Sequence, residues 1–239
     1  MEETFARVET KFMLDTLQAE WIAQRLTERG FEKMCFDSPR IQSLYYDTSD
    51  YALIRQSLVR PLYKEKLRLR TYGEPDCQTQ GFIEIKKKYN HVVYKRRTAL
   101  LLSDAEDLLS PFTPTSCPGQ IGQEVDWMVR RYTLRPSVII TYDRDAYVHP
   151  HDPTVRITFD RKITFRSDHL DLRIAAPGTA LIAPSQRLME IKIPGVYPRW
   201  LLDMIQEAGA TRTHFSKYGE AYTQFLSPQS PCAFYKKGA

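Results

Sequence analysis

Charged and apolar residues alternate with a period of two in at least six segments of the chain. In the segment YKEKLRLRTY, every second position from 64 to 70 is basic, and the positions between include Leu67 and Leu69. Residues i, i+2 and i+4 of a β-strand point to the same face of a sheet. The alternation therefore predicts strands that have one charged face and one apolar face.

Eight strands are predicted in all, and they are rich in the β-branched and aromatic residues that are typical of strands. Their expected ranges are 5–13, 40–47, 63–72, 80–89, 92–101, 137–148, 155–165 and 187–193. The short turn at Asn90-His91 and the loop 73–80 predict that the third, fourth and fifth strands form antiparallel hairpins.

Amphipathic helices are predicted between the strands, at about 16–29, 103–110, 119–133, 198–209 and 215–225. Asp15 is a candidate N-cap, and Gly30 is a candidate for the residue after the end of that helix. Ser103 and Glu106 have the spacing of a capping box. We expect the apolar stripes of these helices to pack against the strands rather than to bind a partner.

Helices that cover the apolar side of a sheet leave its charged side facing away from them. If the sheet curls into a barrel, that charged side lines the interior. The expected fold is therefore α+β, an eight-stranded antiparallel β tunnel or barrel with helices packed outside. The expected interior set is Arg7, Glu9, Lys11, Lys66, Arg68, Arg70, Glu84, Lys86, Lys88, Lys95, Arg97, Arg144, Arg156, Asp160, Lys162, Glu190 and Lys192.

Cations far outnumber carboxylates in this interior set. Two like charges about 4 Å apart repel by about 4 kcal/mol at an effective dielectric constant of about 20. Several such contacts are hard to sustain in a domain whose net stability is about 5–15 kcal/mol. Salt bridges, solvent anions or bound phosphates must relieve them. Arginine offers bidentate contacts to phosphate oxygens and lysine offers point charges, so the mixture suits an extended oligophosphate.

Three carboxylates of the interior set are candidate metal ligands. Mg²⁺ and Mn²⁺ prefer oxygen ligands and often bind through one or two carboxylates together with substrate phosphates. Glu190 is the favoured ligand, and Glu84 and Glu9 are weaker candidates. The alternative is that each glutamate is only a salt-bridge partner for a lysine on the neighbouring strand.

Composition narrows the class of protein. The chain has 239 residues and a formal net charge of +5, which favours acidic partners such as phosphates. The sequence contains no run of about 18 apolar residues, so no membrane span is predicted. The start of the chain lacks the basic and apolar regions of a secretory signal. The four cysteines form no CxxC pair, which is typical of free thiols in the cytoplasm.

No common catalytic motif competes with the charged strands. The sequence contains no phosphate-binding GxxxxGK[ST] loop, no GxGxxG, no GxSxG and no HExxH. Phosphoryl transfer needs no covalent nucleophile, because positioning and charge stabilisation supply most of the catalysis. The strands are spread from one end of the chain to the other, so we expect a single domain over residues 1–226 and a disordered tail over 227–239.

Nine motifs, in order, carry a resemblance to a known family. They are RVETKF, SLYYDTSDYALIR, KEKLRLRTYG, FIEIKKK, VVYKRR, TYDRDAYV, VRITFD, LMEIKIPG and FSKYGEAY. They resemble the VTC domain, the catalytic domain of the vacuolar transporter chaperone polyphosphate polymerase, which belongs to the triphosphate tunnel metalloenzyme superfamily. The resemblance covers about residues 5–225.

The resemblance implies that ATP or another nucleoside triphosphate binds in the tunnel with Mn²⁺ or Mg²⁺. Its γ-phosphate would pass to the end of an inorganic polyphosphate chain. By motif, the residues that would bind the triphosphate and the chain are Lys11, Arg68, Arg70, Lys86, Lys95, Arg144 and Arg156. Glu190 would hold the metal, Lys217 would close the tunnel from the last helix, and Lys192 would line it. Arg7, Lys66, Lys88 and Arg97 complete the expected substrate-binding set.

One departure from the superfamily pattern bears on the reaction. Triphosphatases and adenylate cyclases of the superfamily begin with ExExK, and Arg7 makes the motif RxExK here. A cation at this position removes a potential metal ligand and adds a phosphate contact, which favours a polymerase over a hydrolase. A triphosphatase, a nucleotide cyclase and a non-catalytic polyphosphate-binding module remain as alternatives.

Other partners are less favoured by the sequence. Nucleic acid is not expected as a ligand, because Tyr72 and Tyr142 are aromatic residues in register with basic positions but neither belongs to a run. A partner in a membrane is compatible with a chain that has no predicted membrane span of its own.

Overall fold

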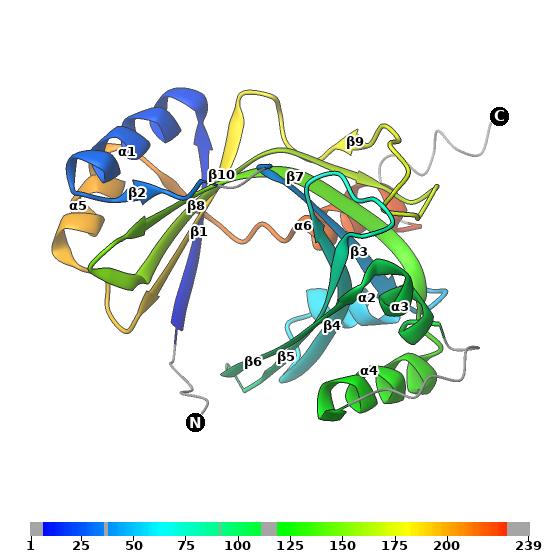
Figure 1. Cartoon of the computed structure of the whole chain (residues 1–239). Coiled ribbons are helices and arrows are strands. Elements are labelled where there is room, and N and C mark those ends of the chain that lie inside the picture. The colour runs from blue at the N-terminus through cyan, green and yellow to red at the C-terminus, as the bar shows by residue number, and fades with distance from the viewer. Residues whose placement is uncertain (1–6, 36–37, 91, 111–118, 229–239) are drawn as a thin grey trace. The chain divides into compact units, whose positions relative to one another are not determined.

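The computed structural model describes residues 7–35, 38–90, 92–110 and 119–228 (Figure 1). Its α+β class and its antiparallel strand pairing are those predicted from the sequence. The eight predicted strands are β1 (Arg7–Asp15), β3 (Arg40–Asp47), β4 (Tyr63–Tyr72), β5 (Gln80–Tyr89), β6 (Val92–Leu101), β7 (Arg135–His149), β8 (Asp152–Arg166) and β10 (Gln186–Pro194). Three short strands that were not predicted are β2 (Glu32–Lys33), β9 (Thr179–Ala180) and β11 (Thr211–Thr213).

The chain divides into two compact units. The first comprises residues up to 39 together with 142–163 and 182–215, and the second comprises 40–141, 164–181 and the remainder from 216. The strands β7 and β8 each contribute residues to both units. The prediction of a single domain over 1–226 stays a prediction, and most of the predicted disordered tail, 229–239, lies outside the described residues.

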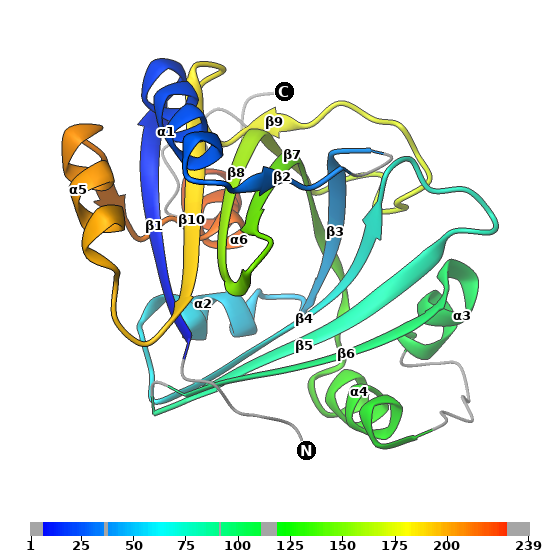
Figure 2. The same ribbon diagram turned by 60° about the vertical axis from the view of Figure 1, so that its left-hand side comes forward.

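In the first unit the strand order is β11-β1-β10-β8-β7, and β2 pairs with β7. Two helices, α1 (Thr16–Glu28) and α5 (Arg199–Glu207), lie side by side along β1 and β10 (Figures 1 and 2). The core beneath them includes Ile22 of α1, Leu201 of α5 and Ile191 of β10. Met189, Ile191 and Ile193 alternate with Glu190 and Lys192 along β10, so the two sets point to opposite faces. The helices therefore cover the face opposite to the charged one.

The ends of α1 are fixed by residues that the sequence identified. The Asp15 carboxylate accepts a hydrogen bond from Gln18 N at 2.8 Å, and the Gln18 side chain accepts one from Asp15 N at 3.0 Å, which makes a capping box. Gly30 follows the helix with φ of +80°, and Phe31 N donates to Leu26 O at 3.0 Å. This is a Schellman motif, and it requires the left-handed backbone that glycine adopts readily.

In the second unit the strand order is β7-β3-β4-β5-β6. The helices α3 (Leu102–Leu108) and α4 (Gly119–Tyr132) contact β6 on its apolar side (Figure 2). The core contains Leu67 and Leu69 of β4, Ile83 of β5 and Met128 of α4. These strand residues alternate with the basic ones, so the predicted separation of an apolar face from a charged face is confirmed.

Two further helices complete the second unit. They are α2 (Ala52–Leu58), which was not predicted, and α6 (Lys217–Ala221), which continues as a π-helical turn at Tyr222–Leu226. None of the helices in the described parts of the chain is long and apolar enough to cross a membrane.

The predicted capping box at Ser103 is wrong. The helix α3 begins at Leu102, its N-cap is Leu101, and no side chain caps it. Leu102 N instead donates to Thr79 O at 3.0 Å, and the Leu102 side chain is buried in the core. Packing of Leu102 at the end of β6 therefore sets where the helix starts, and it overrides the local capping signal.

The prediction that Lys162 belongs to the charged interior is also wrong. Lys162 has φ of +50°, which interrupts the regular alternation of β8. Its side chain is 73% exposed and lies 3.3 Å from the carboxylate of Asp143. The left-handed residue redirects the side chain, and a sequence period of two cannot anticipate it.

Candidate functional site

The charged face of the first unit is built by three neighbouring strands. Lys11 of β1 lies opposite Glu190 of β10, which lies opposite Thr158 of β8. The next row is Glu9, Lys192 and Arg156. Directly opposed residues of an antiparallel pair project from the same face. Arg7 begins β1 opposite Pro194, in the row beyond.

Glu190 lies at the centre of this face, and its side chain is only 7% exposed. Lys11 Nζ lies 3.4 Å from one carboxylate oxygen. Lys192 Nζ at 3.4 Å and Arg144 Nη2 at 3.5 Å approach the other. Three cations thus converge on one buried carboxylate, and two of them also pair with a second one, Lys11 with Glu9 and Arg144 with Asp160.

Arg144 is fixed in place by Asp160. Its Nε and Nη2 donate to the two oxygens of that buried carboxylate at 2.6 and 2.7 Å, a bidentate pair. Burial alone would lower the pKa of Arg144, but the charge of Asp160 outweighs it and raises this pKa. For Lys192, burial dominates and lowers its pKa even though Glu190 and Glu9 oppose the change.

The donor groups around Glu190 suit a metal that binds together with phosphates. The buried Thr158 hydroxyl, opposite Glu190, has no hydrogen-bond partner among the described residues. Within those same residues there is no group of three or more His, Cys, Asp or Glu that could hold a metal alone. Mg²⁺ commonly binds through one or two carboxylates plus phosphate oxygens, so Glu190 fits this mode and a cage made only of protein does not.

The charged face of the second unit is a ladder of basic rows. Register places Lys64 opposite Lys88, and Lys66 opposite Lys86, which lies opposite Lys95 of β6. The row that follows is Arg68, Glu84 and Arg97, and the one after it pairs Arg70 with Phe82. The predicted residues of β4, β5 and β6 are therefore brought together as neighbours.

Glu84 is the only carboxylate in these four rows, and arginines surround it. Arg68 Nε donates to it at 2.6 Å, Arg70 Nε lies at 3.7 Å, and Arg97 Nε lies at 3.8 Å. Burial would raise the pKa of Glu84, but the arginines outweigh burial and lower it. Both of its oxygens are engaged by arginines, so this geometry favours the salt-bridge alternative for Glu84 over metal ligation. Glu9 lies 3.9 Å from Lys11 Nζ.

The lysine rows place like charges side by side. The pKa of Lys64 is lowered by burial first, and then by the charges of Lys88, Lys86 and Arg60. Like charges directly opposite each other destabilise a sheet. A bound polyanion would remove this repulsion, and the described residues of β4, β5 and β6 supply only Glu84 as an acidic counter-charge on this face.

Tyr45 belongs to the charged face and was not predicted. Arg68 Nη1 donates to the Tyr45 hydroxyl at 3.0 Å. Burial raises the pKa of Tyr45, but Arg68, Lys66 and Arg70 outweigh it and lower this pKa to about 8. The signal was present in the sequence, because Ser43, Tyr45 and Asp47 alternate on β3 as the basic residues do on β4.

Lys217 is positioned by the helix that it begins. The neighbouring Tyr218 donates a hydrogen bond from its hydroxyl to Asp47 Oδ2 at 2.8 Å, and its ring stacks on Tyr45 with centroids 4.8 Å apart. Ser216 accepts a hydrogen bond from Lys66 Nζ at 3.4 Å. The start of α6 is thus held against the charged face of β3 and β4, and the role of Lys217 stays a prediction.

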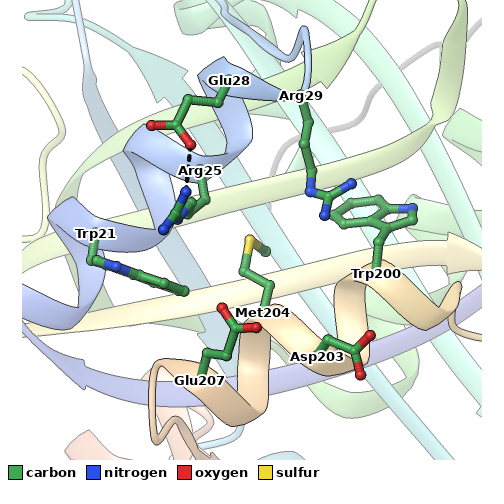
Figure 3. Close-up of a pocket in the computed structure, with 8 residues that line it drawn as sticks. All are labelled: Trp21, Arg25, Glu28, Arg29, Trp200, Asp203, Met204 and Glu207. Carbon is green, nitrogen blue, oxygen red and sulfur yellow. Dashed lines mark hydrogen bonds and ion pairs between the residues drawn. The ribbon is translucent and has the colours of Figure 1, made fainter.

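A separate pocket of about 400 Å³ lies between α1 and α5 (Figure 3). Arg25 lies over the ring of Trp21 and Arg29 lies over that of Trp200, while Asp203 and Glu207 add carboxylates from α5. None of the predicted site residues lines this pocket. It lies on the helical side of the first unit, and its mixed charges offer no convergent set for a polyanion.

Comparison with known proteins agrees with the motifs. The model of the VTC domain family matches residues 6–226. A solved structure of a proposed adenylate cyclase from Bacillus halodurans has a TM-score of 0.53 and 12% sequence identity, over 92% of this chain and 97% of its own. A second proposed adenylate cyclase, from Vibrio parahaemolyticus, has a TM-score of 0.47 and 14% identity, over 91% and 97%. No curated protein matches the sequence significantly. The likeness to the Bacillus protein shows a shared fold.

Proposed function

The chain belongs to the VTC domain family, of the α+β triphosphate tunnel fold, and from this we propose that it is a metal-dependent phosphotransferase. The reaction moves the γ-phosphate of ATP to the end of an inorganic polyphosphate chain. The observation that carries the proposal is the ladder of lysines and arginines on β4, β5 and β6, where like charges face each other in successive rows. Such rows are relieved by a ligand that carries many evenly spaced negative charges.

The proposed phosphoryl transfer needs only basic side chains that position the phosphates and a bound metal ion. An oxygen of the terminal phosphate of the chain attacks the γ-phosphorus of ATP, the bond from that phosphorus to the β–γ bridging oxygen breaks, and ADP leaves. Arg68 and Arg70 orient phosphate oxygens through planar donors, and Lys66, Lys86 and Lys95 balance the charge of the chain. A bound Mg²⁺ or Mn²⁺ would neutralise charge on the phosphate oxygens.

The Glu190 cluster supplies the second part of the proposal. Glu190 would hold the metal together with substrate phosphates, and Lys11, Lys192, Arg144 and Arg156 would contact those phosphates. In the absence of substrate the three cations satisfy the Glu190 carboxylate. We therefore expect metal to bind weakly by itself and tightly in the presence of ATP. Lys88, Arg7 and Lys217 would extend the contacts to the polymer, and Arg97 would contact the nucleotide.

The proposed place of action is the cytoplasm. Cys35 and Cys77 are exposed free thiols, which suits a reducing compartment. The substrates there would be ATP and polyphosphate, with no nucleic acid required.

The deciding experiment is incubation of the purified protein with ATP and Mn²⁺, followed by gel electrophoresis stained for polyphosphate and by an assay of free phosphate. A ladder of polyphosphate with ADP supports the polymerase. Free phosphate or a cyclic nucleotide without a ladder would replace it with a triphosphatase or cyclase. Binding of polyphosphate without turnover would replace it with a binding module. The Arg70→Ala variant serves as the inactive control, and its circular dichroism spectrum should match that of the wild type.

A further inference from the structure

The charged face of the second unit changes its chemistry along the direction of β4. The charged residues of the rows at one end are all lysines, namely Lys64, Lys66, Lys86, Lys88 and Lys95. Arginines with Glu84 follow, and aromatic side chains end the series at Phe82 and Tyr72. Successive rows lie two residues apart, or about 7 Å. A ligand laid along this face therefore meets point charges first, planar donors next and aromatic rings last.

The aromatic end is a stack of planar groups. The Arg97 guanidinium carbon lies 3.7 Å from the centroid of the Phe82 ring and 5.8 Å from that of Tyr72. Arg97 Nη2 donates to the Tyr72 hydroxyl at 3.5 Å. The two rings meet edge to face, with centroids 5.5 Å apart and an interplanar angle of 77°. One guanidinium thus joins both rings.

Tyr72 and Arg97 are open to solvent, and Phe82 is half-buried. Tyr72 is 43% exposed, and the Arg97 side chain is 45% exposed. Aromatic rings and guanidinium planes are the surfaces on which nucleobases stack, and such stacking tolerates any base because every base has a π-face. Arg70 lies directly opposite Phe82 in the same row, and the first phosphates of a nucleotide would lie beside it.

We propose that Tyr72, Phe82 and Arg97 form the stacking site for the base of the nucleoside triphosphate substrate. The phosphates then follow Arg70 and Arg68, and the terminal phosphate points towards the lysine rows. The inference rests on the proposed function, and it assigns the orientation of the nucleotide on this face. Because stacking is tolerant, we expect ATP, GTP and UTP all to bind, with purines ahead of pyrimidines.

The test compares a ligand that has a base with one that has none. Calorimetric titration of ATP and of inorganic tripolyphosphate is carried out on the wild type, Tyr72→Leu and Arg97→Lys. Both variants should bind ATP roughly 5- to 100-fold more weakly, which is the loss expected for one stacking contact. Binding of tripolyphosphate should change by less than about twofold, because Arg97→Lys keeps the charge and Tyr72→Leu removes none.

Tyr89→Leu provides the matched control. Tyr89 is 58% exposed and lies at the lysine end of β5, with the opposite parity to Phe82, so this change should leave both affinities unaltered. If Tyr72→Leu weakens ATP and tripolyphosphate equally, or neither of them, the stacking site is overturned while the phosphate ladder stands. If the wild type binds neither ligand, the proposed function and this orientation are both overturned.

Discussion

Glu190 has a role in the folded state that the structure shows and a role in the reaction that we propose. Its buried carboxylate lies within 3.5 Å of nitrogens of Lys11, Lys192 and Arg144, so without substrate it holds three cations together. In the proposed reaction, substrate phosphates would take over those cations and the carboxylate would be released for a metal. The same group would therefore oppose repulsion in one state and coordinate a metal in the other.

The Glu190→Gln variant separates these two contributions. We expect turnover to fall by at least about 100-fold, because the amide is a poor ligand for a hard divalent cation. The free energy of unfolding should also fall, by about 1–3 kcal/mol, since Lys11, Lys192 and Arg144 each lose one partner and only Arg144 keeps a close one, Asp160. Chemical denaturation with and without tripolyphosphate measures the second effect. Loss of turnover in a variant that tripolyphosphate fails to stabilise would contradict the shared use of these cations.

Tyr45 gives the site a dependence on pH. Its pKa of about 8 lies below the ordinary value of 10.0 because Arg68, Lys66 and Arg70 outweigh its burial. As the pH rises through about 8, the phenolate begins to compete with phosphate for these cations. We expect affinity for tripolyphosphate to fall several-fold between about pH 7 and pH 9 in the wild type and much less in Tyr45→Phe. Titration at a series of pH values tests this, and identical profiles would contradict it.

The same pKa shift fixes the sign of an effect on stability. A tyrosine whose folded pKa is depressed contributes stability that is present above its unfolded pKa of about 10 and is lost as the pH falls through about 8. The wild type should therefore gain stability relative to Tyr45→Phe as the pH rises through this window. Thermal unfolding of both proteins across the window measures the difference.

At the level of single residues, the sequence predicted which side chains share a face but not how they pair. The alternation of positions along the strands predicted that Arg144 and Asp160 both face the interior. The structure adds that they form a bidentate pair. Tyr45 lies on a strand without basic residues at alternate positions, so the alternation of charge does not mark it as part of the charged face. Its place beside Arg68 depends on the register of β3 against β4, which is set by long-range pairing.

At the scale of elements, β5 offers the sharpest check of the charged face. Lys86 and Lys87 are adjacent, yet Lys86 lies in the lysine row between Lys66 and Lys95, whereas Lys87 Nζ lies 2.5 Å from Glu124 of α4. The two side chains therefore serve opposite faces of one strand.

Alanine substitution at these two positions should give different results. Lys86→Ala is expected to weaken tripolyphosphate binding and to lower turnover by about 10-fold, because it removes one charge from the ladder. Lys87→Ala should leave turnover close to that of the wild type and lower the free energy of unfolding by up to about 1 kcal/mol. Steady-state kinetics and denaturation on both variants distinguish the outcomes. Equal losses of activity would show that the two faces are not functionally distinct.

The helix α2 shows why some elements could not be predicted. Its N-cap is Tyr51, in the left-handed region and without a side-chain cap. Asp47 takes over the capping, and it accepts hydrogen bonds from Leu53 N at 2.9 Å and Ile54 N at 3.0 Å. A carboxylate placed this far before the helix does not match the usual capping signal. The long strands and the helix α1, by contrast, carry strong periodicity and local caps.

Asp47 therefore supports two helices at once, because Tyr218 of α6 also donates to it. We expect Asp47→Asn to lower the free energy of unfolding by about 2–4 kcal/mol, since a fully buried acceptor loses its charge-assisted hydrogen bonds. Urea denaturation gives the value. Asp50→Asn, on the exposed neighbour that pairs with Arg55, is the control, and it should behave like the wild type.

For the whole molecule, the decisive quantity is the excess of positive charge on each charged face. We expect tripolyphosphate to raise the thermal midpoint, by an amount that corresponds to about 2.7 kcal/mol at a concentration of 100 times Kd. Added salt should weaken this binding steeply and should by itself stabilise the free protein, because it screens the repulsion. Thermal unfolding at several ionic strengths tests both effects. A salt-independent affinity would contradict an electrostatic ladder.

The division into two compact units could not be seen in the sequence. The strands β7 and β8 continue through both units, so no linker or change of composition marks a boundary. The periodicity of apolar residues indicates which face of a strand or helix is buried. It does not indicate which strands and helices pack together into one compact unit. The order of motifs, on the other hand, was sufficient to identify the family.

The shift from lysines to arginines along β4 has a consequence for how a polymer would travel. An ammonium group has no preferred direction for its hydrogen bonds, so a chain resting on Lys64, Lys66 and Lys86 could slide by one phosphate without breaking an oriented contact. The planar guanidinium groups of Arg68 and Arg70 would hold phosphate oxygens in a fixed geometry and would therefore resist sliding of the chain. Each addition of a phosphate would then push the chain forward across the lysines while Arg68 and Arg70 hold the next nucleotide. The protein could therefore extend one chain many times before releasing it.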